Sequence, residues 1–502
     1  MNLTLHDLYL ISPELALAGL ATILLLLDLV VTRKGLLAAL AMFGLTVPLG
    51  FSVALWMGLD GAWVQPENTG MFRDIVSVDK FGVFFKFLIL GATGLVLLAS
   101  NEYVRKFPRF QTEYYALLLY SATGMMLLAI TVEMITIYIA LELTALPIAA
   151  LAAFLRDGRS SEAGIKFLIL SAISSALLLY GMVLIYGFTG STSLRDVAEQ
   201  IGVLAQNVSE PMGGYAVLMG IVLLVAGFGF KITAVPFQMW APDVYEGSPT
   251  PVTAFLSVAS KAAGFAVILR IFYVGFPIEA LAVEWSAIFA VIAALSMSVG
   301  NLVAIAQSNI KRLLAYSTIA HAGYLMVGLA AVAANGIVDK GALGPSATLF
   351  YLGGYAVTNL AAFFAVIAIS DRIGSDRIED FRGLGRRAPY LAAALAFALV
   401  SLTGVPPTVG FIVKVYIFGA AVNSGLEWLA VVGVINSVVS AYYYVKVIKL
   451  MFVSDPKTTE SITVGIPVRL SVLVTSIAIL VFGVFPAPLL ELARTAARSL
   501  VS

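Results

Sequence analysis

The sequence predicts an all-α protein that crosses a membrane about 14 times. Of its 502 residues, 60% are hydrophobic and only 12% are charged, and the mean hydropathy is +0.98. A soluble protein carries roughly 25% charged residues. Apolar stretches long enough to cross a bilayer as helices recur along the whole chain, and no soluble domain fits between them.

The expected spans are separated by short polar connections. They lie near residues 8–31, 36–57, 79–99, 113–131, 133–154, 163–188, 213–240, 249–274, 283–306, 311–333, 346–370, 389–421, 427–451 and 466–490. The split between the fourth and fifth spans depends on only a few residues around Thr131–Glu133.

Loop charges predict the orientation in the membrane. Most basic residues outside the spans lie in loops that follow odd-numbered spans, which the positive-inside rule places in the cytoplasm. The opposite loops carry only Arg73, Lys80, Arg195, Arg270, Lys340, Arg494 and Arg498. We therefore expect both termini on the outer side of the membrane, and the membrane itself is expected to be a bacterial plasma membrane. The N-terminus lacks a basic start, so no cleavable signal is expected.

Composition argues against several classes of function. The chain has no cysteine, so it supplies no thiolate to an iron–sulfur cluster and forms no disulfide. Two histidines do not favour a haem or zinc site, and no nucleotide-binding or metalloprotease motif is present. The net charge of +1 and the lack of a basic stripe do not favour nucleic acid. Any driving energy would come from an ion gradient or from partner subunits.

The stretch 224–262 combines apolar residues with two lysines, Lys231 and Lys261. A lysine near the centre of a bilayer costs roughly 2.5–3.5 kcal/mol, so such residues usually serve an ion path. Proline ends or breaks helices because it lacks an N–H. Four prolines follow Lys231 and predict a broken seventh span: Pro236, Pro242, Pro249 and Pro251.

The twelfth span repeats this arrangement, with Pro406 and Pro407 shortly before Lys414. It lies five spans after the seventh, and an odd offset means that the second copy is inverted in the membrane. Two inverted five-helix repeats with broken helices are typical of transporters.

Glu142 is the acidic candidate within a span, and it needs a partner or a proton there. It could be a protonated glutamic acid bonded to a neighbouring helix, or it could pair with Lys231. Burial favours the neutral forms of both groups and pairing favours the charged forms, so a small change in separation could hold or release a proton. Lys261 and Lys414 could be satisfied by hydroxyls and carbonyls, with Ser257 and Ser260 near Lys261, or they could carry protons.

His321 could be a simple hydrogen-bonded histidine or a proton relay, because Ser317, Thr318 and Tyr324 lie near it on one helix. Lys86 is expected to extend outward to the membrane surface. Asp28 is expected to pair with the nearby Arg33 and Lys34. Asp243 and Glu246, in a loop after the seventh span, could collect protons or form a solvated turn.

Four motifs resemble the antiporter-like subunits of respiratory complex I, and among them the subunit N family. The motifs are ALELTALPIAAL, GFGFKITAVPFQMWAPDVYEGSPTPVTAFLSVASKAA, NIKRLLAYSTIAHAGY and GVPPTVGFIVKVYIF. Modest length, lysine at position 414 and the loop EDFRGLGRRAP favour subunit N. The resemblance implies 14 transmembrane helices, arranged as an N-terminal three-helix segment 1–112, two inverted five-helix repeats 113–274 and 283–451, and a final helix within 452–502. It also implies a coupling ion pair of Glu142 and Lys231, proton carriage by Lys261 and His321, and a distal site at Lys414.

The resemblance further implies a proton-translocating subunit of a NADH–quinone oxidoreductase. NADH, FMN, iron–sulfur clusters and quinone would be bound by partner subunits, and further antiporter-like subunits would be neighbours in the bilayer. Three alternatives remain at this point. The chain could belong to a multisubunit cation/proton antiporter or a membrane-bound hydrogenase, it could be a secondary transporter acting alone, or its charges could only hold helices together.

Overall fold

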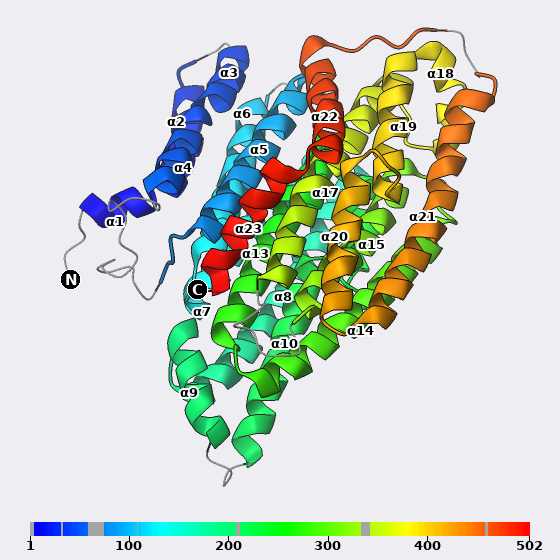
Figure 1. Ribbon diagram of the computed structural model, residues 1–502. Coiled ribbons are helices and arrows are strands. Elements are labelled where there is room, and N and C mark those ends of the chain that lie inside the picture. The colour runs from blue at the N-terminus through cyan, green and yellow to red at the C-terminus, as the bar shows by residue number, and fades with distance from the viewer. Residues whose placement is uncertain are drawn as a thin grey trace.

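The computed structural model describes residues 5–31, 34–58, 75–107, 109–206, 211–332, 342–456 and 460–501. Within these ranges the chain is a bundle of helices and has no strand beyond isolated bridges (Figure 1). Eleven of the described helices are long and apolar enough to cross a membrane. Three shorter apolar helices accompany them, Tyr215–Lys231, Pro389–Thr403 and Val409–Asn423. The predicted all-α membrane class is confirmed.

Of the N-terminal helices, α1 to α4 lie on one flank of the bundle and α5 lies within it (Figure 1). They are α1 (Leu5–Leu10), α2 (Ser12–Asp28), α3 (Lys34–Gly44), α4 (Thr46–Gly58), α5 (Lys80–Tyr103) and the short η2 (Val104–Lys106). Asp79 caps α5 by accepting a hydrogen bond of 2.7 Å from the backbone N–H of Gly82. The predicted pairing of Asp28 is confirmed with Lys34 at 2.6 Å, whereas Arg33 lies outside the described residues.

The first half of the chain continues from α6 to η4, and these helices include the stretch that contains Lys231 and Lys261. They are α6 (Gln111–Ile130), α7 (Met134–Ala152), α8 (Gly158–Thr189), α9 (Leu194–Gln206), α10 (Pro211–Lys231), α11 (Trp240–Gly247), α12 (Thr250–Phe255), η3 (Leu256–Ser260), α13 (Lys261–Arg270) and η4 (Ile271–Gly275). The split between α6 and α7 falls where it was predicted. Glu133 fixes it by accepting hydrogen bonds from the N–H groups of Ile135 and Thr136.

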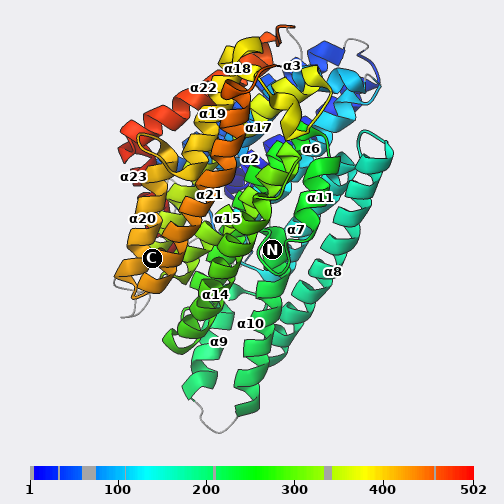
Figure 2. The ribbon, with the colours of Figure 1, turned by 90° about the vertical axis from the view of Figure 1, so that its right-hand side faces the viewer.

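The second half contains α14 (Glu279–Ala304), α15 (Ile310–Ala330), α17 (Leu343–Ile373), η5 (Ile378–Phe381), α18 (Leu384–Arg387), α19 (Pro389–Thr403), α20 (Val409–Asn423) and α21 (Glu427–Val453). The helices α22 (Ile466–Val484) and α23 (Ala487–Val501) complete the chain. In the turned view of Figure 2, α8 runs along one edge of the molecule and α23 lies toward the opposite edge.

Both predicted helix breaks are present. The seventh span stops at Lys231 and resumes at Trp240 as α11, and the twelfth stops at Thr403 and resumes at Val409. Prolines occupy both interruptions, Pro236 in the first and Pro406 and Pro407 in the second. The expected loop position of Asp243 and Glu246 is wrong, because both lie on α11.

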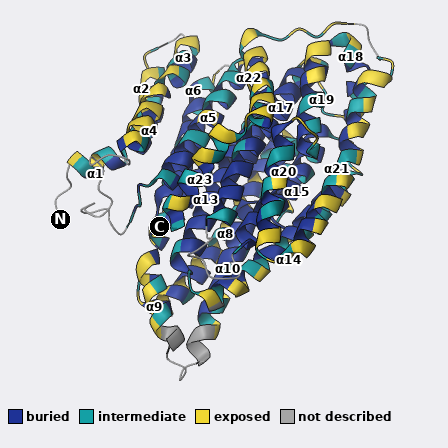
Figure 3. Ribbon diagram, in the orientation of Figure 1, coloured by how far each residue is buried: buried dark blue, intermediate teal, exposed yellow. Residues whose placement is uncertain are grey.

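Burial separates interior helices from peripheral ones (Figure 3). The most apolar windows of α15 and α17 are 94% buried, and that of Thr250–Gly275 is entirely buried. The corresponding windows of α8, α21 and α22 are only 33% buried, so these helices present apolar surface to the outside. The segment 250–275, which contains Lys261, therefore lies inside the protein and not at its surface.

Two charged residues lie in the interior, contrary to the sequence expectation. Lys86 does not extend outward but is fully buried on α5, 2.9 Å from the Glu14 carboxylate of α2. Arg270 is not in a loop but ends α13, where it forms two hydrogen bonds to Asp79 of 2.8 and 2.9 Å. Sequence spacing does not show such partners, because each pair joins helices far apart in the chain.

We expect Glu14→Leu to destabilise the N-terminal flank by about 3–5 kcal/mol, because it leaves the Lys86 ammonium buried without its counter-charge. The measurement is thermal release of the chain from the purified native assembly. The double variant Glu14→Leu/Lys86→Met removes both charges and should recover most of the loss. Equal instability of the single and double variants would contradict the ion-pair explanation.

Candidate functional site

Glu142 lies half-buried on α7, facing α8. Ser175 of α8 donates a hydrogen bond of 2.5 Å to its Oε1 atom. A hydroxyl that donates to a carboxylate stabilises its ionised form, whereas burial favours the protonated form. This hydrogen bond holds Glu142 against the neighbouring helix α8.

Lys231 is the last residue of α10, and its ammonium is buried without a hydrogen-bond partner in the described part of the chain. It lines a cavity of about 30 Å³ together with Ser171, Ser174 and Ser175 of α8. A cavity of that size with several polar groups can hold a water molecule. Ser175 thus touches both this cavity and Glu142.

Glu142 and Lys231 are not among the direct ion pairs found in the described ranges. A serine hydroxyl and a water-sized cavity lie between the two groups. Their role as a coupling pair stays a prediction, and in this arrangement it would operate at longer range than direct contact.

Lys261 begins α13, directly after the π-helical turn η3. Its ammonium donates to the backbone oxygen of Thr318 at 2.5 Å and to Oγ1 of Thr233 at 3.1 Å. Thr233 lies in the interruption of the seventh span and Thr318 lies on α15. These partners are not the serines expected from the sequence, Ser257 and Ser260. Ser257 donates instead to the carbonyl of Ala254. Lys261 therefore connects the broken helix to the helix that carries His321.

His321 is buried among tyrosines. Its Nδ1 atom is 2.8 Å from the hydroxyl of Tyr351, and its ring centroid is 5.1 Å from Tyr355 and 5.5 Å from Tyr324. The Lys261 ammonium is 5.8 Å from the centroid of the Tyr355 ring. Tyr355 is thus shared by Lys261 and His321, and the predicted proximity of Tyr324 to His321 is confirmed.

Lys414 is buried on α20 and holds the broken end of α19. Its ammonium donates to the carbonyls of Leu402 and Thr403 at 3.0 and 2.9 Å. These carbonyls lie at the C-terminus of α19, where the helix dipole favours a cation. Gly404 has a φ of +90°, and a Cβ there would lie 2.9 Å from Cδ of Lys414, so glycine leaves space for the lysine. The ammonium is also 4.7 Å from the centroid of Tyr324.

The structure brings Lys261, His321 and Lys414 together through tyrosines, and it joins Glu142 to the Lys231 cavity through Ser175. Sequence reasoning did not identify Ser175, Thr233, Tyr351 or Tyr355 as members of this site. Only the two tyrosines left a signal, since they lie four residues apart within an apolar span and therefore share one helix face.

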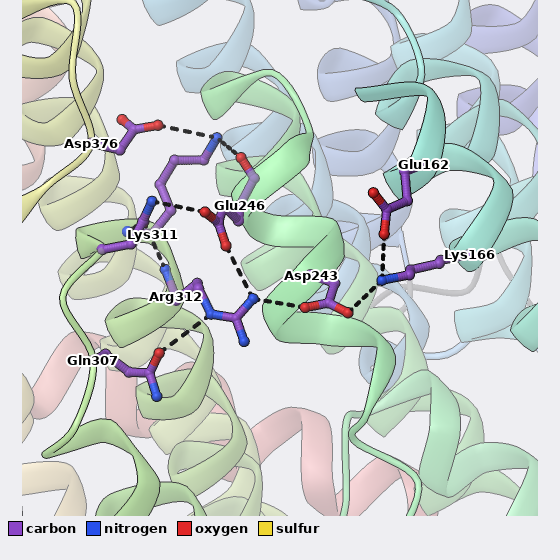
Figure 4. Close-up of polar contacts among 9 residues, drawn as sticks. Glu162, Lys166, Asp243, Glu246, Gln307, Lys311, Arg312 and Asp376 are labelled. Carbon is purple, nitrogen blue, oxygen red and sulfur yellow. Dashed lines mark hydrogen bonds and ion pairs between the residues drawn. The ribbon is translucent and has the colours of Figure 1, made fainter. Parts of the chain in front are cut away.

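A second charged cluster lies on α11 and its neighbours (Figure 4). Asp243 contacts Arg312 at 2.7 Å and Lys166 at 2.8 Å, and Glu246 contacts Arg312 at 3.0 Å. The cluster lines a cavity of about 240 Å³. Burial alone would raise the pKa of Asp243, but hydrogen bonds from Lys166 and Arg312 lower it below its ordinary value. Asp243 is therefore ionised at neutral pH, which favours an ion-pair clamp over proton uptake at this carboxylate.

Comparisons with known proteins agree with this architecture. A family profile described as the transmembrane part of NADH:quinone oxidoreductase and Mrp antiporters matches residues 131–440. NADH-quinone oxidoreductase subunit N of Dehalococcoides mccartyi is 43% identical over 495 residues, which is 98% of this chain and 99% of the relative. The subunit N of Heliobacterium modesticaldum is 45% identical over 434 residues, covering 86% of this chain and 88% of the relative.

Solved structures show the same likeness. A chain of respiratory complex I from Thermus thermophilus with bound aureothin has a TM-score of 0.76 and 34% identity, covering 95% of this chain and 98% of that one. A chain of the Mrp complex from Dietzia sp. has a TM-score of 0.82 at 22% identity, covering 100% of this chain and 98% of that one, and shares the fold.

The fold is an all-helical membrane bundle with two broken helices, and it buries Lys231, Lys261, His321 and Lys414. These features are those of an antiporter-like membrane subunit. The chain belongs to the NADH:quinone oxidoreductase/Mrp antiporter family and, within it, to the subunit N family of NADH-quinone oxidoreductases. The resemblance predicted from the four sequence motifs is confirmed.

Proposed function

We propose that this chain is a proton-translocating membrane subunit of a respiratory NADH–quinone oxidoreductase, with Glu142, Lys231, Lys261, His321 and Lys414 as its proton-carrying residues. Quinone reduction in partner subunits would drive it. The observation that supports this most is the burial of Lys261, His321 and Lys414 around one tyrosine cluster, where protons can pass between neighbouring groups. Charged residues inside a membrane are costly, and such clusters are typical of proton pathways.

The first step takes place between Glu142 and Lys231. An approach of the carboxylate stabilises the protonated lysine, and its withdrawal releases that stabilisation, so the proton leaves for Lys261. Ser175 and the adjoining cavity provide the bridge between the two groups. Moving one charge across 100 mV requires about 2.3 kcal/mol. A tenfold change in proton affinity is worth about 1.4 kcal/mol, so about two such changes suffice.

The second step carries the proton from Lys261 past His321 to Lys414. Neutral imidazole accepts a proton at one nitrogen and releases one at the other, which suits it to a relay. Tyr355 lies between the first two groups, and Tyr324 lies between His321 and Lys414. The carbonyls at the end of α19 then hold the proton on Lys414.

The remaining organisation is proposed on the same basis. Residues 113–274 and 283–451 form two inverted repeats, 1–112 is an N-terminal three-helix segment and 452–502 contains the last span. The interruptions at 232–239 and 404–408, five spans apart, support the repeats.

Charge in the loops supports a cytoplasmic basic face, with both termini on the outer side of the bacterial plasma membrane. Partner subunits would hold NADH, FMN, iron–sulfur clusters and quinone, since this chain has no cysteine for a cluster.

Replacement of the coupling residues tests the function. We expect Lys231→Ala and Glu142→Ala, each in the whole complex reconstituted in vesicles, to lower the rate of proton pumping coupled to quinone reduction by about tenfold or more, as for loss of a proton-transfer group. Both rates are measured in the same preparation, and Glu279→Ala serves as the control because Glu279 is exposed at the start of α14. Wild-type pumping in both variants would refute the assignment.

The alternative is a subunit of a cation/proton antiporter complex, favoured by the fold shared with the Mrp complex from Dietzia sp.. Purification of the native assembly separates the two, because only the proposed function requires partner subunits that oxidise NADH. Gradient-driven cation uptake by an assembly without such subunits would favour the alternative.

A further inference from the structure

A second polar region adjoins His321 from the side of α21, and the proposed pathway does not use it. A cavity of about 530 Å³ lies between the end of α14, η5 and α21. Gln307, Ser308, Glu379 and Lys446 line it, and these residues belong to the face where the basic loops gather. The volume and the polar lining allow the cavity to hold water.

Two adjacent tyrosines of α21 lead from this cavity toward the proton-carrying residues. Tyr443 lines the cavity, and its ring centroid is 4.3 Å from that of Tyr444. The hydroxyl of Tyr444 shares a hydrogen bond of 2.5 Å with Oγ of Ser317. Ser317 precedes His321 by four residues on α15, so the two side chains lie on the same helix face about one turn apart. Tyr443, Tyr444 and Ser317 thus lead from the cavity to the helix turn that precedes His321.

We propose that this row of hydroxyls, from Tyr443 through Tyr444 to Ser317, is a second water-fed proton route that joins the basic face of the protein to His321. The inference rests on the proposed function, since it adds an access route to the same proton-carrying residues. Each hydroxyl oxygen accepts a proton from the cavity side and releases its own proton to the next oxygen, so none of them retains a charge. The last proton passes through a water molecule to the ring nitrogen of His321 that does not contact Tyr351.

Asn301 controls this route. The Tyr443 hydroxyl donates to Oδ1 of Asn301 at 2.9 Å, so in this state its proton is engaged by Asn301. Rotation of that single hydroxyl toward Tyr444 completes the row. Asn301 is itself fixed, because its amide nitrogen donates to the carbonyl of Met297 at 2.9 Å and lies 3.3 Å from Oδ1 of Asn436. Asn301 is thus a positioning residue that sets whether the route conducts.

The neighbouring residue provides a matched control. Tyr442 is 62% exposed on the outer side of α21, whereas Tyr443 and Tyr444 are buried. If the hydroxyls served only to pack α14, α15 and α21 together, their loss would change the stability of the bundle. If they conduct protons, their loss lowers pumping strongly with only a slight loss of stability, because phenylalanine retains the ring and each variant loses only the hydrogen bond of one hydroxyl.

The experiment compares Tyr444→Phe, Tyr443→Phe and the control Tyr442→Phe in the whole complex reconstituted in vesicles. Proton pumping, quinone reduction with an uncoupler present, and thermal release of the chain are measured for each. We expect Tyr444→Phe and Tyr443→Phe to lower the pumping rate by about tenfold or more. Their uncoupled quinone reduction should match the wild type, and their release temperature should fall only slightly, by the loss of one hydrogen bond. Tyr442→Phe should match the wild type in all three measurements.

Lys261→Met in the same preparation distinguishes failure of the route from failure of the proposed function. Loss of pumping in Lys261→Met together with wild-type pumping in both Tyr444→Phe and Tyr443→Phe overturns the route and leaves the function standing. Wild-type pumping in Lys261→Met overturns both. If both tyrosine variants lose pumping and their chains are also released at a much lower temperature than the wild type, the hydroxyls serve packing. That result also overturns the route.

Discussion

Lys261→Met is expected to lower coupled proton pumping by about tenfold or more. Methionine retains much of the volume of the buried side chain and removes the ammonium that contacts both Thr233 and Thr318. Lys261 is the only proton-carrying residue proposed here that touches both the broken seventh span and α15. Its loss therefore separates the Glu142 and Lys231 end of the path from the His321 and Lys414 end. Pumping and quinone reduction, measured together in reconstituted vesicles, report this directly.

The matched control for that variant is Lys449→Met, which removes the same charge from an exposed position on α21. The control should pump like the wild type. If Lys261→Met and Lys449→Met lower pumping equally, the effect comes from charge loss in general and not from the position of Lys261. Thermal release of the chain should be measured as well, so that a folding defect in Lys261→Met is recognised.

Arg270→Leu is expected to destabilise the chain by about 3–5 kcal/mol, the cost of leaving one partner of a buried ion pair alone. The guanidinium is buried, forms two bonds to Asp79 and donates twice to the carbonyl of Ala129. It also lies nine residues after Lys261 on the same helix, about 13 Å along the axis. Loss of this anchor should loosen the end of α13 and lower the temperature at which the chain is released from the complex.

Two further variants separate the ion pair from other effects. Arg270→Leu/Asp79→Asn removes both charges and retains a side-chain cap at the start of α5, so it should recover part of the lost stability. Arg498→Leu removes an exposed arginine from α23 and should have little effect. A release temperature for Arg270→Leu equal to that of Arg498→Leu would show that the buried pair does not stabilise the fold.

Local sequence features were sufficient for much of this fold. Apolar length places most of the spans, although α2 (Ser12–Asp28) is not among the helices long and apolar enough to cross a membrane. The prolines at 236, 406 and 407 place both helix breaks, because the lack of an N–H acts on the helix that contains it. The candidate residues Glu142, Lys231, Lys261, His321 and Lys414 were found for a similar reason. An ionisable side chain in an apolar stretch is conspicuous without any knowledge of its neighbours.

Partners across helices required the structure. Lys86 was expected at the membrane surface because it lies only a turn or two inside the third span, yet Glu14 of α2 lies 2.9 Å away. Arg270 was placed in a loop by its position near the end of a span, but it is paired with Asp79. The partners of Lys261, Thr233 and Thr318, likewise come from other segments.

The sequence by itself determined the class of protein, the order and approximate limits of the spans, the two breaks and the residue types that can carry protons. These depend on hydrophobic length and on backbone chemistry, which act over a few neighbouring residues. Only the tertiary structure decided which charges face each other, that Ser175 and a small cavity lie between Glu142 and Lys231, and that tyrosines of α17 surround His321. Such contacts join residues distant in the chain, and helix packing alone sets which of them meet.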